Sequence, residues 1–241
     1  MRLYQKFASG VPDYLARYYW WAYLWPWGIW LFDRQFTINA ILFGQYDKLL
    51  HKTQRLVETS ADARLLQLTC VYGKLTPSLL DICEGDLHLC DVADAQLQLT
   101  RSKTSQLVGR CRLTRMNAER MGYANDAFDQ VIVFFLLHEM PDGARRRTYA
   151  EIARVVRIGG SVLITEYAST PHLHLLYRFT PFRWLIGKLE PFLPGFWQED
   201  VAASLVDALH ENGKALNGDP HTEHVFAGYY RVMRFNICNQ N

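Results

Sequence analysis

The sequence lacks an excess of charge of either sign. Lysine and arginine together number 26, aspartate and glutamate number 24, and the formal net charge of the 241 residues is +2 at pH 7. A field strong enough to collect nucleic acid needs a much larger basic excess, so we expect no nucleic-acid partner. The chain is instead 49% hydrophobic, which at this length is enough to bury one sizeable core.

Cysteine is scarce, and its spacing argues against two structural roles. The five cysteines are odd in number and none stands in a CxxC pair, so neither a disulfide framework nor a zinc knuckle is indicated; they are Cys70, Cys83, Cys90, Cys111 and Cys238. The first residues also lack the charged, apolar and small-residue order of a secretory signal. We therefore expect a reducing compartment.

A long apolar run is missing too. The segment "YYWWAYLWPWGIWLF", Tyr18 to Phe32, holds five of the seven tryptophans and is interrupted by Pro26 and Gly28. As a helix it would span roughly 22 Å, against about 30 Å of bilayer hydrocarbon. Tryptophan and tyrosine prefer the headgroup boundary, so peripheral attachment to a membrane surface is predicted. An aromatic lid on the protein's own core is the alternative, and the two are compatible.

From Arg64 onward, strand and helix patterns alternate, which predicts an α/β Rossmann-like fold with a doubly wound, mostly parallel sheet. The expected strands are 63–71, 86–93, 111–116, 128–137 and 160–167, with 224–237 as an antiparallel edge strand. The expected helices are 73–83, 95–105, 144–157, which Gly159 and Gly160 would close, and 198–213. We predict an N-terminal aromatic helical cap over 1–60 and a main domain over 61–241, with a lipid-facing insertion at about 170–198.

The turn within "LLQLTCVYGKLT", Leu65 to Thr76, is similar to the glycine-rich turn that opens a nucleotide-binding βαβ unit. Two of the three expected glycines are absent, and only Gly73 remains. Asp91 follows 18 residues later at the end of the second strand, where a carboxylate can accept both ribose hydroxyls of a nucleoside.

Together with "NAERMGYANDAFDQVIVFFLLHEMP" and "RVVRIGG", this order resembles the class I S-adenosylmethionine-dependent methyltransferases over about Leu65 to Tyr167. The resemblance implies S-adenosylmethionine as cofactor, with Asp91 on the ribose and Gly73 beneath the methionine. The cofactor-binding candidates are Gln67, Thr69, Val71, Tyr72, Gly73, Asp91, Val92, Asn117, Ala118 and Phe135.

The chain departs from that family's pattern at the methionine end. Gln67 stands where an acid is usual, Thr69 and Val71 replace glycines, Tyr72 replaces a small residue, and Asn117 replaces the adenine acid. Neutral drift of a degenerate loop is one explanation. A changed methionine position is the other, because a Cβ now stands where the backbone must approach the cofactor.

More specific motifs resemble the rhodoquinone biosynthesis (RquA) family: "YYWWAYLWP", "DRQFTINAILFGQYDKL", "CVYGKLTP", "FDQVIVFFLLHEMP" followed by "RRRT", and "RVVRIGG" before Tyr167. This resemblance implies conversion of ubiquinone to rhodoquinone, in which an amino group replaces a ring methoxy group. It also implies S-adenosylmethionine as nitrogen donor and a requirement for manganese (Mn²⁺). The setting would be the cytoplasmic face of a bacterial inner membrane or a mitochondrial inner membrane.

His138 and Glu139 follow the fourth strand and are candidates for metal binding and catalysis, together with Tyr72 as a further catalytic residue. Quinone-pathway O-methyltransferases that use a divalent metal tend to carry a Glu-His pair there, and this chain carries the reverse order. Imidazole and carboxylate suit manganese. Glu166 is the expected third metal ligand, and His172 and His174 are weaker candidates. A structural hydrogen-bonded pair is the alternative.

Other segments predict simpler roles. Arg145, Arg146 and Arg147 are expected on a solvated helix face or against anionic lipid. The aromatic stretch Leu175 to Trp197 predicts a tunnel for an isoprenoid tail, or a cap that closes the core. Two further functions remain open beside aminotransfer: methylation of a quinone or other lipid, and lipid binding without catalysis.

Overall fold

The computed structural model describes residues 10–105, 110–169 and 174–240. It divides into two compact units, residues 1–121 and 122–241, and each is described by itself. No helix among the described residues has both the length and the apolar character needed to cross a membrane.

The first unit begins with short helices rather than one long one. A π-helical turn, Leu15–Tyr19, leads into α1 (Trp20–Tyr23), and the chain then bends before α2 (Pro26–Phe32), α3 (Gln35–Ile41) and α4 (Tyr46–Gln54). Pro26 begins α2, where its missing N–H costs nothing. Gly28, which was expected to interrupt the helix, lies inside α2. A Cβ there would lie 1.7 Å from the Trp21 carbonyl oxygen, so Gly28 lets α1 and α2 pack closely.

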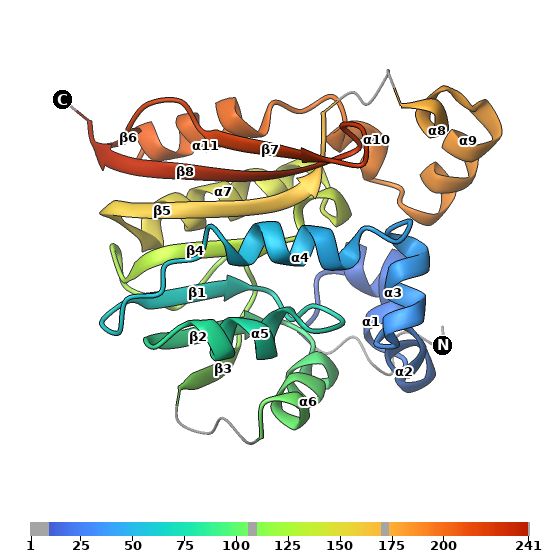
Figure 1. Ribbon diagram of the computed structural model, residues 1–241, viewed down its shortest axis with the longest axis horizontal. Coiled ribbons are helices and arrows are strands. Elements are labelled where there is room, and N and C mark those ends of the chain that lie inside the picture. Colours follow the sequence, from blue (N-terminus) through green and yellow to red (C-terminus); the bar gives the residue numbers. More distant parts are fainter. Residues whose placement is uncertain (1–9, 106–109, 170–173, 241) are drawn as a thin grey trace. The chain divides into compact units, whose positions relative to one another are not determined.

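Three parallel strands form the sheet of the first unit (Figure 1): β1 (Arg64–Leu68), β2 (Asp86–Asp91) and β3 (Cys111–Arg115). The connecting helices are α5 (Leu75–Ile82) and α6 (Asp94–Lys103). Four consecutive residues of β1 are buried, as expected of a parallel strand covered on both faces. Because Leu68 pairs with Cys90, the loops after β1 and β2 leave the sheet at the same edge.

The second unit is a mixed sheet (Figure 1). β4 (Phe128–Phe134) runs parallel to β5 (Val156–Tyr167), and β8 (Tyr230–Asn239) is antiparallel to β5. The short strands β6 (Lys214–Leu216) and β7 (His221–Val225) pair with β8. The helices are α7 (Asp142–Val155), α8 (Leu175–Arg178), α9 (Thr180–Leu189), α10 (Leu193–Phe196) and α11 (Val201–His210).

Two sequence-based expectations for the second unit are wrong. The expected closing strand 224–237 is a hairpin of β7 and β8, and β8 lies inside the sheet because it pairs with β5 on one side and with β6 and β7 on the other. Gly159 and Gly160 do not close α7, which ends at Val155. They lie within β5, where a Cβ on Gly160 would stand 2.6 Å from the Asp129 carbonyl oxygen.

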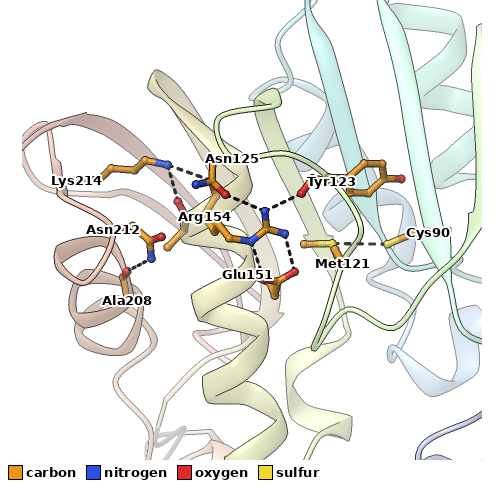
Figure 2. Close-up of polar contacts among 10 residues, drawn as sticks. Cys90, Met121, Tyr123, Asn125, Glu151, Arg154, Ala208, Asn212 and Lys214 are labelled. Atoms are coloured by element: carbon orange, nitrogen blue, oxygen red, sulfur yellow. Dashed lines mark hydrogen bonds and ion pairs between the residues drawn. The ribbon is translucent and has the colours of Figure 1, made fainter.

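The end of α7 is held by a charged network instead (Figure 2). Lys214 is buried, and its Nζ donates to the carbonyl oxygens of Ala153 at 2.8 Å and Val156 at 2.6 Å. Arg154 binds both carboxylate oxygens of Glu151, at 2.8 and 2.9 Å. A cation beside unpaired C-terminal carbonyls is favourable for a helix, so this network does what the glycines were expected to do.

Candidate functional site

The loop between β1 and α5 is braced from within by Gln67. This side chain is fully buried, and its amide nitrogen donates to the Thr69 carbonyl at 2.8 Å. Its amide oxygen accepts from the Thr76 hydroxyl at 3.0 Å. Both amide groups are thus used on the loop itself, which an acid at this position could not do because it has no donor.

Asp91 joins the loops that follow β1 and β2. Its two carboxylate oxygens accept from the backbone N–H groups of Cys70 at 2.9 Å and Ala93 at 2.8 Å. Burial raises the pKa of Asp91 to about 6, although these hydrogen bonds lower it. The carboxylate therefore stands at the end of β2, where the sequence predicted a ribose ligand.

Tyr72 contacts the N-terminal helices. Its hydroxyl donates to the Ala22 carbonyl oxygen and accepts from the Gln96 amide at 2.7 Å. Its ring stacks on Tyr23 with the centroids 5.6 Å apart and the planes 6° from parallel. The hydroxyl that the sequence placed near the methionine is therefore engaged by two protein groups, which fix the loop against α1.

The backbone of Gly73 forms hydrogen bonds with an ion pair, Asp33–Lys103, that the sequence did not indicate. Its N–H donates to Asp33 Oδ1 at 3.1 Å, its carbonyl accepts from Lys103 Nζ at 3.1 Å, and Lys103 also binds Asp33. The backbone φ of Gly73 is +84°, and a Cβ would lie 2.5 Å from Tyr46 Oη. Both the left-handed backbone and this close approach require glycine.

The remaining cofactor candidates fall into two groups. Ala118 is buried and Asn117 Oδ1 accepts from Glu119 N at 2.9 Å, so the Asn117 side chain shapes its own turn. Thr69, Val71 and Val92 lie in the same unit, on the loops after β1 and β2. Phe135 belongs to the other unit. It has a φ of 52°, and its ring contacts His138, Tyr167 and Tyr230.

His138 and Glu166 form a buried pair in the second unit. His138 lies in the 3₁₀ turn Leu137–Glu139, and its Nδ1 is 3.0 Å from Glu166 Oε2. Glu166 also accepts from the backbone N–H groups of Leu137 at 2.7 Å and Tyr167 at 3.0 Å. Burial alone would lower the pKa of His138, but the charge and hydrogen bond of Glu166 raise it to about 9.

A cluster of three potential metal ligands includes Glu190 rather than Glu166. One ligand atom each of His138, Glu139 and Glu190 lies within 4.8 Å of the others. His138 is buried, while the two carboxylates are partly exposed. Glu166 stands behind His138 on Nδ1, as the carboxylate of a carboxylate–histidine–metal arrangement does. The arrangement leaves the other ring nitrogen of His138 for a metal.

Other candidates take structural positions. His174 is at the N-terminus of α8, where its Nδ1 accepts from Leu176 N at 3.3 Å, and His172 lies outside the described residues. Arg145, expected in solvent, is buried and paired with Glu199, whereas Arg146 and Arg147 are exposed as expected. The residues near the candidate sites that sequence reasoning missed are Asp33, Tyr46, Lys103, Glu190 and Arg231.

Part of the chain is similar in sequence to methyltransferases. A family model described as "Methyltransferase domain" matches residues 65–160. The ubiquinone/menaquinone biosynthesis C-methyltransferase UbiE of a Marinomonas species is 32% identical over 51% of this chain and 48% of its own. The demethylmenaquinone methyltransferase of Bacillus licheniformis is 29% identical over 68% of this chain and 73% of its own. The chain thus spans about half the length of the first of these relatives.

Solved structures show the same fold at low identity. Phosphoethanolamine N-methyltransferase 2 of Haemonchus contortus, in complex with S-adenosyl-L-methionine, has a TM-score of 0.64 and 14% identity, over 95% of this chain and 59% of its own. The cyclase SpnF has a TM-score of 0.57 and 17% identity, over 79% and 80%. One of these two proteins is named as a methyltransferase and the other as a cyclase, although they share a fold. The fold therefore does not by itself decide the reaction.

The fold is therefore the Rossmann-like α/β fold of class I methyltransferases, with a mixed, mostly parallel sheet and N-terminal helices. Residues 65–160 match a methyltransferase domain, and the chain is similar over part of its length to methyltransferases named for ubiquinone and menaquinone biosynthesis.

Proposed function

We propose that this protein is an S-adenosylmethionine-dependent quinone aminotransferase that converts ubiquinone to rhodoquinone. In this reaction the α-amine of S-adenosylmethionine would replace a ring methoxy group, which leaves as methanol. The bond between that nitrogen and the cofactor's α-carbon would then have to break to give the free amino group. The observation that carries the proposal is in the loop between β1 and α5. There the backbone N–H of Gly73 donates to Asp33, which forms an ion pair with Lys103. The names of the relatives support a quinone substrate.

The ion pair suits the methionine end of the cofactor. That end is a zwitterion, with one carboxylate and one ammonium group, and Asp33 and Lys103 offer one charge of each sign. Their side chains are 21% and 18% exposed, so a ligand can reach them. In the proposed arrangement Lys103 would bind the cofactor carboxylate, and Asp33 would hold the amine and accept its proton, because only an unprotonated amine can add to a quinone.

The cluster of His138, Glu139 and Glu190 fits manganese by its donors. One imidazole and two carboxylates are ligands that a divalent first-row metal accepts. When bound, manganese would supply Lewis-acid polarisation of the quinone oxygens. Glu166 would orient His138 and is not a ligand in this proposal, because its oxygens already accept from His138 Nδ1 and from backbone N–H groups.

Methylation of a quinone is the second candidate function. The relatives are named C-methyltransferases and demethylmenaquinone methyltransferase, which favours it. In that reaction the methyl group of S-adenosylmethionine is transferred and S-adenosylhomocysteine is the product. The ion pair at Gly73 would then only anchor the cofactor.

Mass spectrometry of the quinone product separates the two candidates. The protein is incubated with ubiquinone, manganese and S-adenosylmethionine labelled at the α-nitrogen. Aminotransfer predicts labelled nitrogen in the quinone, and only when manganese is present. Glu190→Gln should raise the manganese concentration needed for half-maximal rate at least tenfold, while Asp142→Asn, an exposed acid on α7, should leave it unchanged.

Two outcomes would contradict aminotransfer. One is rhodoquinone without the label, which would mean a different nitrogen donor. The other is methylated quinone and S-adenosylhomocysteine in equal amounts, which would establish the methyltransferase instead.

We also propose that the protein works at a membrane surface, since its quinone substrate carries an isoprenoid tail. Large aromatic side chains are exposed on α2, among them Trp27 at 67% and Trp30 at 53%. Arg34 lies over the Trp30 ring at 4.2 Å. Exposed tryptophan beside a cation is the pattern of an interfacial segment.

A further inference from the structure

Arg231 on β8 is a buried cation with an unused hydrogen-bonding edge. Arg231 is buried, with 8% of its surface exposed. Nη1 donates to the Ser169 hydroxyl at 2.8 Å. Nε and Nη2 are both buried, and neither has a hydrogen-bond partner among the described residues. Four other arginines of this unit contact a carboxylate: Arg145, Arg146, Arg154 and Arg157. Within the described part of the chain, no carboxylate forms an ion pair with Arg231.

The two unpaired groups lie on one edge of the guanidinium plane. Nε–H and one N–H of Nη2 point the same way, and this edge binds two oxygen atoms side by side. A buried guanidinium without acceptors is unfavourable, because it has lost its water and gained nothing in return. Such a group is expected where a ligand supplies the missing oxygens.

The register of the sheet places this edge beside the candidate metal cluster. Arg231 is the cross-strand partner of Glu166 in the β5–β8 pair. Side chains that stand opposite each other in an antiparallel pair project from the same face. Glu166 is bound to His138 on that face. A ligand on the Arg231 edge would therefore approach the side of the sheet that carries the His138 pair.

The charges around Arg231 favour a neutral ligand over an anion. Burial lowers the pKa of Arg231, and four groups act against this shift: Glu166 first, then Tyr149, Asp200 and Glu199. Three of these four are carboxylates, and they would repel a further anion. A neutral molecule with two neighbouring acceptor oxygens would satisfy the N–H groups without adding charge.

We propose that the Nε–Nη2 edge of Arg231 binds the quinone, through one carbonyl oxygen and the neighbouring methoxy oxygen. The choice of a quinone rests on the proposed function. A methoxyquinone offers such a pair of adjacent oxygens, whereas a quinone that carries methyl groups in place of methoxy groups offers only single carbonyls. Arg231 is accordingly a substrate-binding residue that selects methoxylated rings.

The same contact would assist the substitution. When an amine nitrogen adds to the other methoxy-bearing carbon, a C–N bond forms and an electron pair moves to the conjugated carbonyl oxygen held by Arg231. Charge-assisted hydrogen bonds to that oxygen strengthen as its negative charge develops. The pair then returns, the C–O bond breaks, and the methoxide leaves as methanol with the proton lost by nitrogen. This substitution step needs no oxidant or reductant, and its product still carries the bond between nitrogen and the cofactor's α-carbon, which a later step must break.

Calorimetry with two soluble quinones tests the proposal. The wild-type protein should bind dimethoxy-methylbenzoquinone at least tenfold more tightly than trimethylbenzoquinone. Arg231→Lys keeps the charge but loses the two-oxygen edge, so it should bind both quinones with nearly equal affinity. Arg234→Lys, the same change at a partly exposed position of β8, should keep the wild-type preference.

The readout is a ratio measured within one variant, so a partly unfolded sample does not distort it. Arg231→Gln serves as a second variant, and it should also lose the preference. A retained preference in Arg231→Lys would overturn the proposal, as would an equal loss of affinity for both quinones. Tight competition by benzoate in the wild-type protein would also overturn it, since that identifies a carboxylate site.

Failure of the aminotransfer proposal looks different. In that case the labelled nitrogen does not reach the product, yet the preference for the dimethoxy ring and its dependence on Arg231 persist. The protein would then bind methoxyquinones through Arg231 and carry out another reaction on them.

Discussion

At the scale of single residues, Asp91 has a structural role and is also the proposed ribose ligand. It is the only carboxylate in the described residues that bonds to the N–H groups of both Cys70 and Ala93, so it fixes two loops at the edge of the sheet. Burial still raises its pKa to about 6, above the usual 3.8. Its charge state therefore changes within an accessible pH range.

The expected consequence is a pH-dependent affinity for S-adenosylmethionine. A carboxylate accepts both ribose hydroxyls only when it is ionised, so affinity should rise from pH 5 to pH 7 and level off above. Below about pH 6 the affinity should fall by at most about tenfold per pH unit.

The folding stability of the ligand-free protein should change with pH in the opposite sense. A raised folded-state pKa stabilises the fold below the unfolded pKa, and this contribution is lost as pH rises through about 6.

Calorimetric titration with S-adenosylmethionine at several pH values measures the first effect. Asp91→Asn cannot ionise, so its affinity should be lower than that of the wild type at pH 7 by at least tenfold, about 1.4 kcal/mol, and should vary little with pH. Parallel pH profiles for the two proteins would show that Asp91 does not carry the titration.

The residues that sequence reasoning missed share one property: their partners are distant in the chain. Asp33 meets Gly73 across 40 residues, and Lys103 meets Asp33 across 70. No local pattern marks such a contact, because charged residues on short helices are ordinarily solvated. Asp91 was predictable because its position after a buried strand is itself a local signal.

At the scale of elements, the end of α7 shows why helix boundaries were harder to predict than helices. The sequence places two glycines after a helical pattern, which is typical of a C-terminal cap. Val155 and Val156, both β-branched, instead mark the change from helix to strand, and the capping cation, Lys214, comes from β6. Because this capping residue is distant in the sequence, no residue pattern near the end of the helix predicts it.

Lys214→Met should therefore destabilise the protein. The change removes charge-assisted hydrogen bonds to the carbonyls of Ala153 and Val156 and leaves those groups without their donor. We expect a loss of about 2 kcal/mol or more, which lowers Tm by about 4–8 °C for a chain of this size. Thermal unfolding followed by circular dichroism measures it. Lys48→Met, at an exposed position of α4, is the control, and an equal effect in both variants would contradict the capping role.

At the scale of the whole molecule, the class of fold was predictable and the composition of its sites was not. Buried apolar strands alternating with helices predict a Rossmann-like sheet directly, and the strands from β1 to β5 appear where the sequence indicated. The hairpin at the end was missed because Phe226 and Ala227 take positive φ values. Neither residue type ordinarily signals a turn of that kind. Of the three residues in the candidate metal cluster, the sequence had singled out His138 and Glu139, whereas Glu190 follows α9 with no motif around it.

The exposed aromatic surface of α2 gives the last prediction. The sequence alone singled out Trp20, Trp21 and Trp25 as membrane contacts. In the structure Trp21 is partly buried: its N–H donates to the Tyr18 carbonyl at 2.8 Å. The most exposed tryptophans of the N-terminal helices are Trp25, Trp27 and Trp30.

Replacing Trp25, Trp27 and Trp30 together with serine should lower binding to liposomes at least tenfold, because interfacial affinity scales with the apolar area that enters the headgroup region. Co-sedimentation with liposomes measures the change, and Ile158→Ser, an exposed apolar position on β5, should have no effect. The same triple variant should raise KM for a long-tailed quinone more than for a short-tailed analogue, since only the long tail must be drawn from the bilayer. Equal KM changes for both quinones, with liposome binding intact, would assign the three side chains to a cap over the protein rather than to a membrane contact.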